Sequence, residues 1–303
     1  MKKQILLLAT VCSALCASTA QKVTAFEHLD LGVTLGTTGV GIDVATPISE
    51  QFRLRAGFSF IPEFDVKMNF GMEGENGNDL HSMADKLVDL TGLEIKDNID
   101  MLGNPNFYNG NLLVDFYPIK NINFHVTAGF YYGSSKIASA CNTIEDMTTL
   151  LSVSMFNNIH DKIEAGEPIL GEDIYLPPEV EEKILENGRL GVHVGDRTDT
   201  GEPYMMEPDK NSTIKVDVFV NSFKPYIGVG YGGRLAKNND CVRIAFDAGV
   251  MFWGGAPKVV THDGVDLVRD VENIDGKIGD YVSIVKGIKV YPVLNLKISF
   301  RVF

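Results

Sequence analysis

Apolar and polar residues alternate along several segments of the chain, each about 10 to 13 residues long. Residues 52–60 place phenylalanine, leucine and alanine on one face and arginine, glycine and serine on the other. Residues 123–132 and 242–253 repeat the pattern. A period of two predicts β-strands with one buried face. Strands of soluble sandwiches usually have about 5 to 6 residues, whereas strands that span a membrane need about 9 to 11.

The connections between these segments alternate between short and long. Three short polar turns each join two apolar segments into a hairpin, at 49–51, 120–122 and 236–240. Three long insertions follow the hairpins, at about 67–108, 137–212 and 255–287. Short turns on one side and long loops on the other are typical of outer-membrane β-barrels. We therefore interpret residues 21–303 as one barrel with three loop insertions.

The number of strands depends on a change of phase near the N-terminus. Apolar residues occupy odd positions in 31–35 and even positions in 40–44, so the side chains change face between Gly36 and Gly39. A bulge there would leave an odd number of strands, which bacterial single-chain barrels avoid, so we predict a tight turn. The predicted strands are 29–36, 39–48, 52–65, 109–119, 123–136, 224–235, 241–254 and 289–303. The expected fold is all-β, a closed antiparallel transmembrane barrel of eight strands with both termini in the periplasm.

The insertions contain further predicted elements. A second change of phase precedes Pro225, and we predict that residues 214–221 extend the sixth strand above the membrane, with a kink at the proline. Helical spacing of apolar residues, or helix start and stop signals, indicates four helices in the extracellular loops. They are predicted within 80–102, 144–163, 177–188 and 265–286.

The N-terminal residues have the pattern of a secretory signal peptide. Lys2 and Lys3 precede an apolar run over 5–17, and small residues occupy 18–20. We predict removal of residues 1–20 and therefore export. The two cysteines that remain, Cys141 and Cys241, fall at opposite ends of an apolar band about 25 Å tall. Because bridged Cα atoms lie within about 7 Å, we expect two free thiols.

The strand segments also resemble a known group of proteins. The residues that carry the resemblance are Gly36 to Gly41, Phe52 to Gly57, Asp115 to Pro118, Lys224 to Tyr231, Phe246 to Val250 and Tyr291 to Val293. In this order they are similar to small Gram-negative outer-membrane β-barrels of the OmpA/OmpX-type eight-stranded group. The same motifs suggest a protein of the Bacteroidota. The resemblance covers about a third of the chain and none of the long loops. It implies a fold and a location but no specific function.

The polar faces of the predicted strands carry charges that would point into the barrel. These residues are Asp43, Arg53, Arg55, Asp115, Arg243, Asp247, Lys297 and Arg301. One interpretation is a charged, selective pore. We favour an interior salt-bridge network that plugs the lumen, because an eight-stranded barrel is just wide enough for side chains to fill it. Unpaired buried charge is also costly.

The charge balance excludes some functions. The formal net charge is −13, which argues against nucleic acid as a partner. Residues 137–212 alone hold 16 carboxylates and 5 lysines or arginines, so the cap that they form is acidic. No loop has the aspartate spacing of a calcium site, and we predict neither a metal nor a cofactor. Gly-x-Ser-x-Gly and His-Glu-x-x-His are both absent from the sequence, so we expect no enzyme.

The sequence therefore predicts an integral outer-membrane barrel with a structural or surface-interaction role, exerted through an acidic extracellular cap. Its expected partners are outer-membrane lipid, the barrel-assembly machinery, and an extracellular or neighbouring membrane protein bound by the loops. Three alternatives stay open. They are a narrow channel for small solutes, an outer-membrane hydrolase and an exported soluble β-protein.

Overall fold

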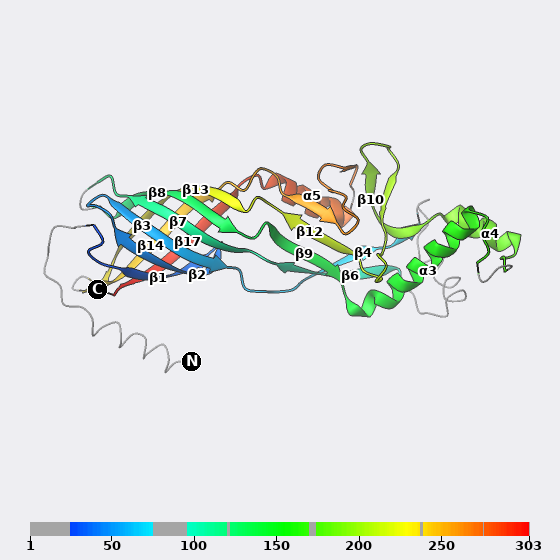
Figure 1. Cartoon of the computed structure of the whole chain (residues 1–303), viewed down its shortest axis with the longest axis horizontal. Helices are drawn as coiled ribbons and strands as arrows, with labels where there is room; N and C mark the ends of the chain where they lie inside the picture. Colours follow the sequence, from blue (N-terminus) through cyan, green and yellow to red (C-terminus); the bar gives the residue numbers. More distant parts are fainter. Residues whose placement is uncertain are drawn as a thin grey trace.

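The computed structural model describes residues 25–74, 96–119, 122–169, 174–236, 239–274 and 276–302. Within them, eight antiparallel strands close into a barrel in the order β1-β17-β14-β13-β8-β7-β3-β2. The strands are β1 (Asp30–Gly36), β2 (Gly39–Pro47), β3 (Phe52–Phe60), β7 (Tyr108–Phe116), β8 (Phe124–Gly133), β13 (Phe223–Ala236), β14 (Asn239–Met251) and β17 (Tyr291–Arg301). The molecule is elongated, with the barrel at one end (Figure 1). The predicted fold class is confirmed.

The change of phase near the N-terminus is a turn, as predicted. Gly36 pairs with Gly39 across it, and Asp30 pairs with Arg301 where β1 meets β17 and closes the barrel. Gly39 has a φ of +88°, which favours glycine. A side chain there would also overlap the carbonyl group of Phe60 on the neighbouring β3. Both the turn and the approach of β3 therefore require glycine at this position.

The barrel turns its apolar residues outward. Leu35 is 62% exposed, Ile42 66% and Ile227 53%, and these residues lie on three different strands. The intervening residues of the same strands point into the barrel, as the buried Arg55 and Asp115 do on their own strands. A soluble β-sandwich would bury its apolar strand faces against a second sheet. The observed orientation is the opposite one.

A five-stranded sheet stands beyond one end of the barrel. Its strands, in the order β15-β12-β9-β6-β4, are β15 (Lys258–Thr261), β12 (Lys215–Phe219), β9 (Lys136–Asn142), β6 (Asn98–Pro105) and β4 (Val66–Gly71). Along the chain these strands adjoin β14, β13, β8, β7 and β3, which stand in the same order in the barrel wall. This upper sheet therefore continues more than half of the barrel wall after a break in each strand.

Two sequence predictions about this region are wrong. Residues 214–221 do not extend the sixth strand, because β12 ends at Phe219 and belongs to the upper sheet, whereas β13 begins at Phe223. The break lies at 220–222, and Pro225 stays paired with Phe130 inside the barrel wall. The helix predicted over 80–102 is a strand from Asn98 onward, since β6 pairs with β4 and β9. The earlier part of that prediction lies outside the described residues.

Helices and a small sheet complete what we call the cap, the described residues within 61–107, 134–222 and 252–290. The short 3₁₀ helix η1 (Ile144–Asp146) leads into α3 (Met147–Glu164), and α4 (Pro178–Asn187) and α5 (Gly276–Gly287) follow. The small sheet contains β11 (Pro203–Met206), β10 (Leu190–Arg197), β16 (Val271–Glu272) and β5 (Glu73–Gly74). The helices predicted over 144–163 and 177–188 are confirmed, and α5 occupies only the second half of 265–286.

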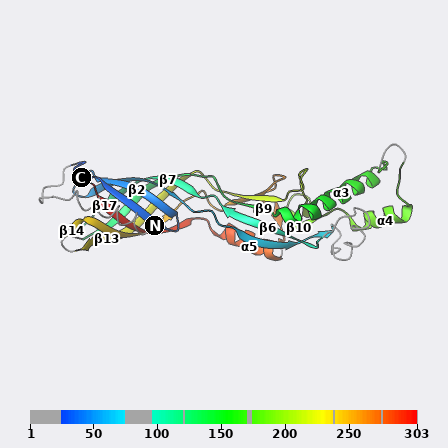
Figure 2. The same ribbon diagram turned by 90° about the horizontal axis from the view of Figure 1, so that it is seen from below.

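The cap has its own apolar core. Leu150, Val153 and Phe156 on one face of α3 pack with Leu190 and Val192 of β10. Figures 1 and 2 place α3 and α4 at the end of the molecule farthest from the barrel, and α5 beside the upper sheet. None of the helices among the described residues is long and apolar enough to cross a membrane.

The cysteine prediction is correct for one residue only. Cys141 has a free thiol. Cys241 is disulfide-bonded, so the expectation of two free thiols is wrong for Cys241. The prediction considered only pairing between Cys141 and Cys241, because residues 1–20, with Cys12 and Cys16, were expected to be removed.

Candidate functional site

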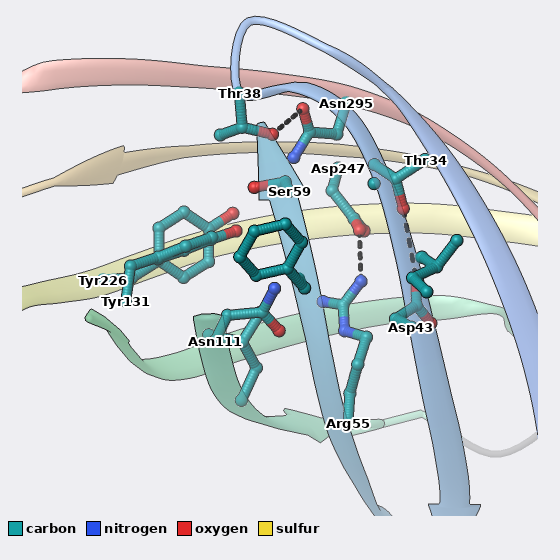
Figure 3. Close-up of a pocket in the computed structure, with 14 residues that line it drawn as sticks. Thr34, Thr38, Asp43, Arg55, Ser59, Asn111, Tyr131, Tyr226, Asp247 and Asn295 are labelled. Carbon is teal, nitrogen blue, oxygen red and sulfur yellow. Dashed lines mark hydrogen bonds and ion pairs between the residues drawn. The ribbon is translucent and has the colours of Figure 1, made fainter. Parts of the chain in front are cut away.

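A network of buried charges fills the middle of the barrel. The guanidinium group of Arg55 on β3 donates to Asp247 of β14 at 2.6 Å and to Asp115 of β7 at 2.9 Å. Thr127 donates to the same Asp115 oxygen at 2.7 Å, and Nε2 of His125 lies 2.8 Å from Asp247. Four strands thus supply one cluster, because every second residue of each strand points inward. Figure 3 shows Arg55 reaching across to Asp247.

A second cluster lies nearer the ends of β1 and β17. Asp30 forms an ion pair with Arg53, and Nε of Arg301 lies 3.8 Å from the same carboxylate. His28 is also 3.8 Å from Asp30. Asp43, on β2, accepts a hydrogen bond from Thr34 at 3.0 Å (Figure 3). Each of these carboxylates therefore has a donor inside the barrel.

Two small cavities lie in the lumen among the residues that the structure describes. The one drawn in Figure 3 has a volume of about 20 Å³, close to the space of a single water molecule. A second cavity, of about 110 Å³, is lined by Arg243 and Lys297, with Arg53 and His125. Lys297 is only 4% exposed. The charged side chains therefore occupy most of the interior.

Apolar side chains close the barrel at the end that faces the cap. This plug consists of Phe107, Leu113, Tyr131, Tyr226, Met251 and Val293. The rings of Tyr131 and Tyr226 meet edge to face with centroids 5.4 Å apart. Beside them Nζ of Lys224, which is fully buried, donates to Asn109 at 2.9 Å and to the carbonyl of Ser134 at 3.0 Å. The plug separates the charged lumen from the cap.

The structure places all eight of the charges singled out from the sequence inside the barrel. Arg55, Asp115 and Asp247 meet in one cluster, whereas Arg53 and Arg301 belong to the other. Asp43, Arg243 and Lys297 line the two cavities. Sequence reasoning missed Asp30, Lys224 and the plug. Asp30 shares the inward phase of Gly32 and Thr34, so alternation within β1 was a signal that could have identified it.

A larger cavity lies in the cap, between the upper sheet and α5. Its volume is about 360 Å³. The sheet contributes Met68, Ala140 and Val218, and α5 contributes Ile278 and Val282. None of the described residues that line it is charged. We call it the apolar pocket. The sequence did not predict it, because its walls come from six strands and a helix that lie far apart along the chain.

The cap also contains polar clusters with metal-ligand atoms. Single ligand atoms of His160, Asp161 and Glu164 on α3 lie within 4.8 Å of one another. Arg189 already forms an ion pair with Asp161 and a second one with Glu207 at 2.5 Å. These hydrogen bonds, that to Glu207 foremost, raise the pKa of Arg189, so its positive charge is permanent. A cation at this cluster would have to compete with the guanidinium group.

Tyr204 marks another polar cluster in the cap. Its hydroxyl group lies 3.0 Å from the Thr261 hydroxyl and donates to Asp263 at 2.9 Å. Burial, together with the nearby Asp263 carboxylate, raises the pKa of Tyr204, so its hydroxyl stays protonated at neutral pH. The guanidinium group of Arg197 lies 5.1 Å from the centre of the Tyr204 ring. The cluster therefore fixes β11 against the loop that follows β15.

Comparisons with known proteins add only a general likeness. No family model and no curated protein matches the chain. Among solved structures, CarO2 and CarO of Acinetobacter baumannii each show 13% identity and a TM-score of 0.38. These matches cover 93% and 90% of this chain, and 100% and 97% of the other chains. A major outer membrane protein from Thermus thermophilus shows 12% identity and a TM-score of 0.30, over 90% of this chain and 98% of its own. Because these TM-scores are low, the fold assignment rests on the strand pairing described above.

Proposed function

We propose that this chain is an integral outer-membrane β-barrel protein that is closed to solutes and acts through its cap at the cell surface. The observation that carries the proposal is the exposed apolar surface all around the barrel. Ile42, Ile227 and Leu294, on three strands, are 66%, 53% and 47% exposed. Contact of such a surface with water is unfavourable, whereas contact with the hydrocarbon core of a membrane is favourable.

The distribution of loops supports an orientation. In bacterial barrels the short turns lie in the periplasm and the longer loops outside. The turns after β2 and β13 are short, whereas the segments that form the cap are long. We place the cap outside the cell and both termini in the periplasm. Export by a signal peptide at 1–20 and insertion by the barrel-assembly machinery belong to the same proposal.

The interior argues against transport through the barrel. The ion pair between Arg55 and Asp247 bridges the lumen from β3 to β14, Arg55 also pairs with Asp115 on the adjacent β7, and the apolar plug stands between this cluster and the cap. A solute would have to break buried ion pairs and displace aromatic rings. The role of the charges in this proposal is therefore to fill and stabilise the barrel.

The histidines support a non-enzymatic role. His125 is 2% exposed, and its Nε2 is bonded to Asp247 inside the barrel. Nδ1 of His262 accepts a hydrogen bond of 3.5 Å from the backbone N–H of Lys215. A serine hydrolase instead needs a histidine in contact with a nucleophile in an accessible site. A surface-interaction role requires only the folded cap, which has its own core and the apolar pocket.

The membrane assignment is tested by washing the outer-membrane fraction with carbonate. We expect the protein to stay with the membrane and to migrate differently on a gel with and without boiling. Closed barrels resist unfolding in detergent until they are heated, and a boiled and an unboiled soluble protein would migrate alike. Release into the soluble fraction with a single mobility would contradict the proposal and favour an exported soluble β-protein.

A further inference from the structure

The apolar pocket is a hollow with two walls rather than a flat surface. Met68 and Met101 lie on neighbouring strands of the upper sheet and form part of one wall, and Val282 on α5 forms part of the other. Met101 is 2% exposed and Val282 7%, so the pocket reaches the core of the cap. Its volume of about 360 Å³ is within the usual range of ligand pockets, about 300 to 1,000 Å³.

The pocket is open to its surroundings on one side. Phe64 and Val66, at one edge, are 55% and 44% exposed, and Tyr281 on α5 is 44% exposed. The ring of Tyr281 contacts Phe70 edge to face, with centroids 6.4 Å apart. A slot of about 360 Å³ between a sheet and a helix admits a hydrocarbon chain more readily than a folded protein element, because a helix with side chains is about 10 to 12 Å wide.

The chemistry of the lining selects an apolar occupant. Among the described lining residues, polar side-chain atoms come only from Asn104, Ser139 and Tyr281. An occupant with polar groups inside the slot would lose hydrogen bonds to water and regain few of them. The part of a ligand that enters the slot is therefore a hydrocarbon.

Lys277 brings its ammonium group to β4, the edge strand of the upper sheet at this slot. Nζ of Lys277 donates to the backbone carbonyl of Asn69 at 3.4 Å. Asn69 is flanked by Met68 and Phe70, and Lys277 by Ile278, and these three neighbours all line the pocket. Within the described residues Lys277 forms no salt bridge to a carboxylate. An ammonium group at the edge of an apolar slot complements a molecule with a hydrocarbon tail and an anionic head.

From this geometry we infer that the apolar pocket binds a free long-chain fatty acid, with its tail between the upper sheet and α5 and its carboxylate at Lys277. The inference deepens the proposed function, on which it rests, by naming the ligand class of the cap. Binding is non-covalent and needs no other group. The acidic surface elsewhere in the cap disfavours the carboxylate, so Lys277 also fixes which end of the molecule enters.

The test is photoaffinity labelling of the full-length protein in lipid nanodiscs. The probe is palmitic acid with a diazirine in the middle of its chain, and the cross-linked residues are mapped by mass spectrometry. We expect labels on pocket residues such as Met68, Val218 and Val282. A parallel sample contains nanodisc phospholipid with the same diazirine in one acyl chain, which distinguishes a membrane lipid from a free acid.

Variants assign the label to the slot. Val218→Trp fills the pocket and should reduce labelling there at least about tenfold, and Ala140→Leu is a milder second filling variant. Lys277→Gln should weaken competition by unlabelled palmitate about two- to fivefold, as expected for an exposed ion pair. Leu102→Trp is the matched control, because Leu102 belongs to β6 but pairs with Lys67 and Cys141 on the opposite face of the upper sheet. It should leave labelling unchanged.

The outcomes separate the inference from the proposed function. Labels only on the outside of the barrel, in a protein that still shows the heat-dependent mobility shift, would overturn the inference and leave the proposed function intact. Labelling of the pocket by phospholipid but not by palmitic acid would also overturn it. A label that persists in both filling variants would show that it lies elsewhere. Loss of membrane retention would overturn the proposed function itself.

Discussion

Single residues in this protein contribute through partners that are distant in the sequence. Arg55 is the clearest case, because its two carboxylate partners lie 60 and 192 residues away and all three side chains are buried. Removing one member of a buried ion cluster leaves the others without compensation. Exposed pairs behave differently, since water screens them. The same kind of contact therefore has unequal effects in the barrel and on the cap surface.

Arg55→Met should destabilise the barrel by about 3 to 5 kcal/mol, because Asp115 and Asp247 would stay buried without their cation. The measurement is the denaturant concentration at which the refolded protein in detergent loses its heat-dependent mobility. Lys67→Met is the control, since it breaks an ion pair to Asp100 in which the lysine is 63% exposed. That midpoint should not move. Equal shifts for the two variants would contradict a special role for the lumen cluster.

Asp146 gives the cap a dependence on pH. Burial by itself raises the pKa of Asp146, but hydrogen bonds from Lys96, the backbone N–H of Asp100 and Thr143 outweigh it and hold the pKa below its ordinary value. A carboxyl group whose pKa is lower in the folded state stabilises that state above its unfolded pKa, about 3.9. This contribution is lost as the pH falls through the folded pKa.

We therefore expect the start of α3 to become less stable below about pH 4. Helical circular dichroism during urea titration, at about pH 6 and about pH 3, measures the change while the barrel stays folded. Asp146→Asn should be less stable than the native chain at the higher pH and should show a smaller difference between the two. An unchanged pH difference in the variant would exclude Asp146 as its source.

Among the strands, five of the barrel wall are each followed or preceded along the chain by a separate strand of the upper sheet. β3, β7, β8, β13 and β14 each adjoin a strand of the upper sheet across a short break. The remaining strands, β1, β2 and β17, adjoin no strand of the upper sheet along the chain. β1 and β2 form a hairpin with the tight turn at Gly36 and Gly39. The short turn leaves no cap segment between β1 and β2. β17 follows α5 directly along the chain.

Gly39→Ala should destabilise the barrel by more than the cost of a positive φ alone. An alanine with a positive φ costs about 1 to 2 kcal/mol, and here its Cβ would also overlap the carbonyl of Phe60. Gly201→Ala is the control, with a φ of +72° and no atom within 4 Å of the added Cβ. The measurement is the apparent melting temperature of the mobility shift. Similar decreases of the melting temperature in both variants would mean that β3 moves to accommodate the added methyl group.

At the scale of the whole molecule, the barrel and the cap have separate interiors. Ion pairs fill the barrel, apolar contacts form the core of the cap, and the plug around Tyr131 and Tyr226 divides them. The apolar pocket opens beside the cap core and not into the lumen, because its lining contains none of the plug residues. A ligand in the cap is therefore separated by the whole barrel from the end at which β1 begins and β17 ends.

The purified protein should give a flat baseline in planar lipid bilayers, since the cavities of the lumen are about 20 and 110 Å³. A general porin in the same bilayer serves as the control for insertion and recording. Discrete conductance steps that change in Asp247→Asn would contradict the closed barrel and favour the narrow channel. Bilayer recording thus decides between the two functions that the inward charges allow.

Alternation along the chain is enough to predict the eight strands of the barrel, the turn at Gly36 and Gly39, and which residues point into the barrel. These properties are local, because alternation sets the direction of each side chain along its own strand. That Arg55 meets both Asp115 and Asp247, and that Asp30 completes the second cluster, follows from the packing of the strands around the lumen. Partner choice depends on register between strands far apart in the chain. For the same reason β12 and β6 could not be assigned to an upper sheet, and the apolar pocket, whose walls come from seven separate elements, could not be foreseen.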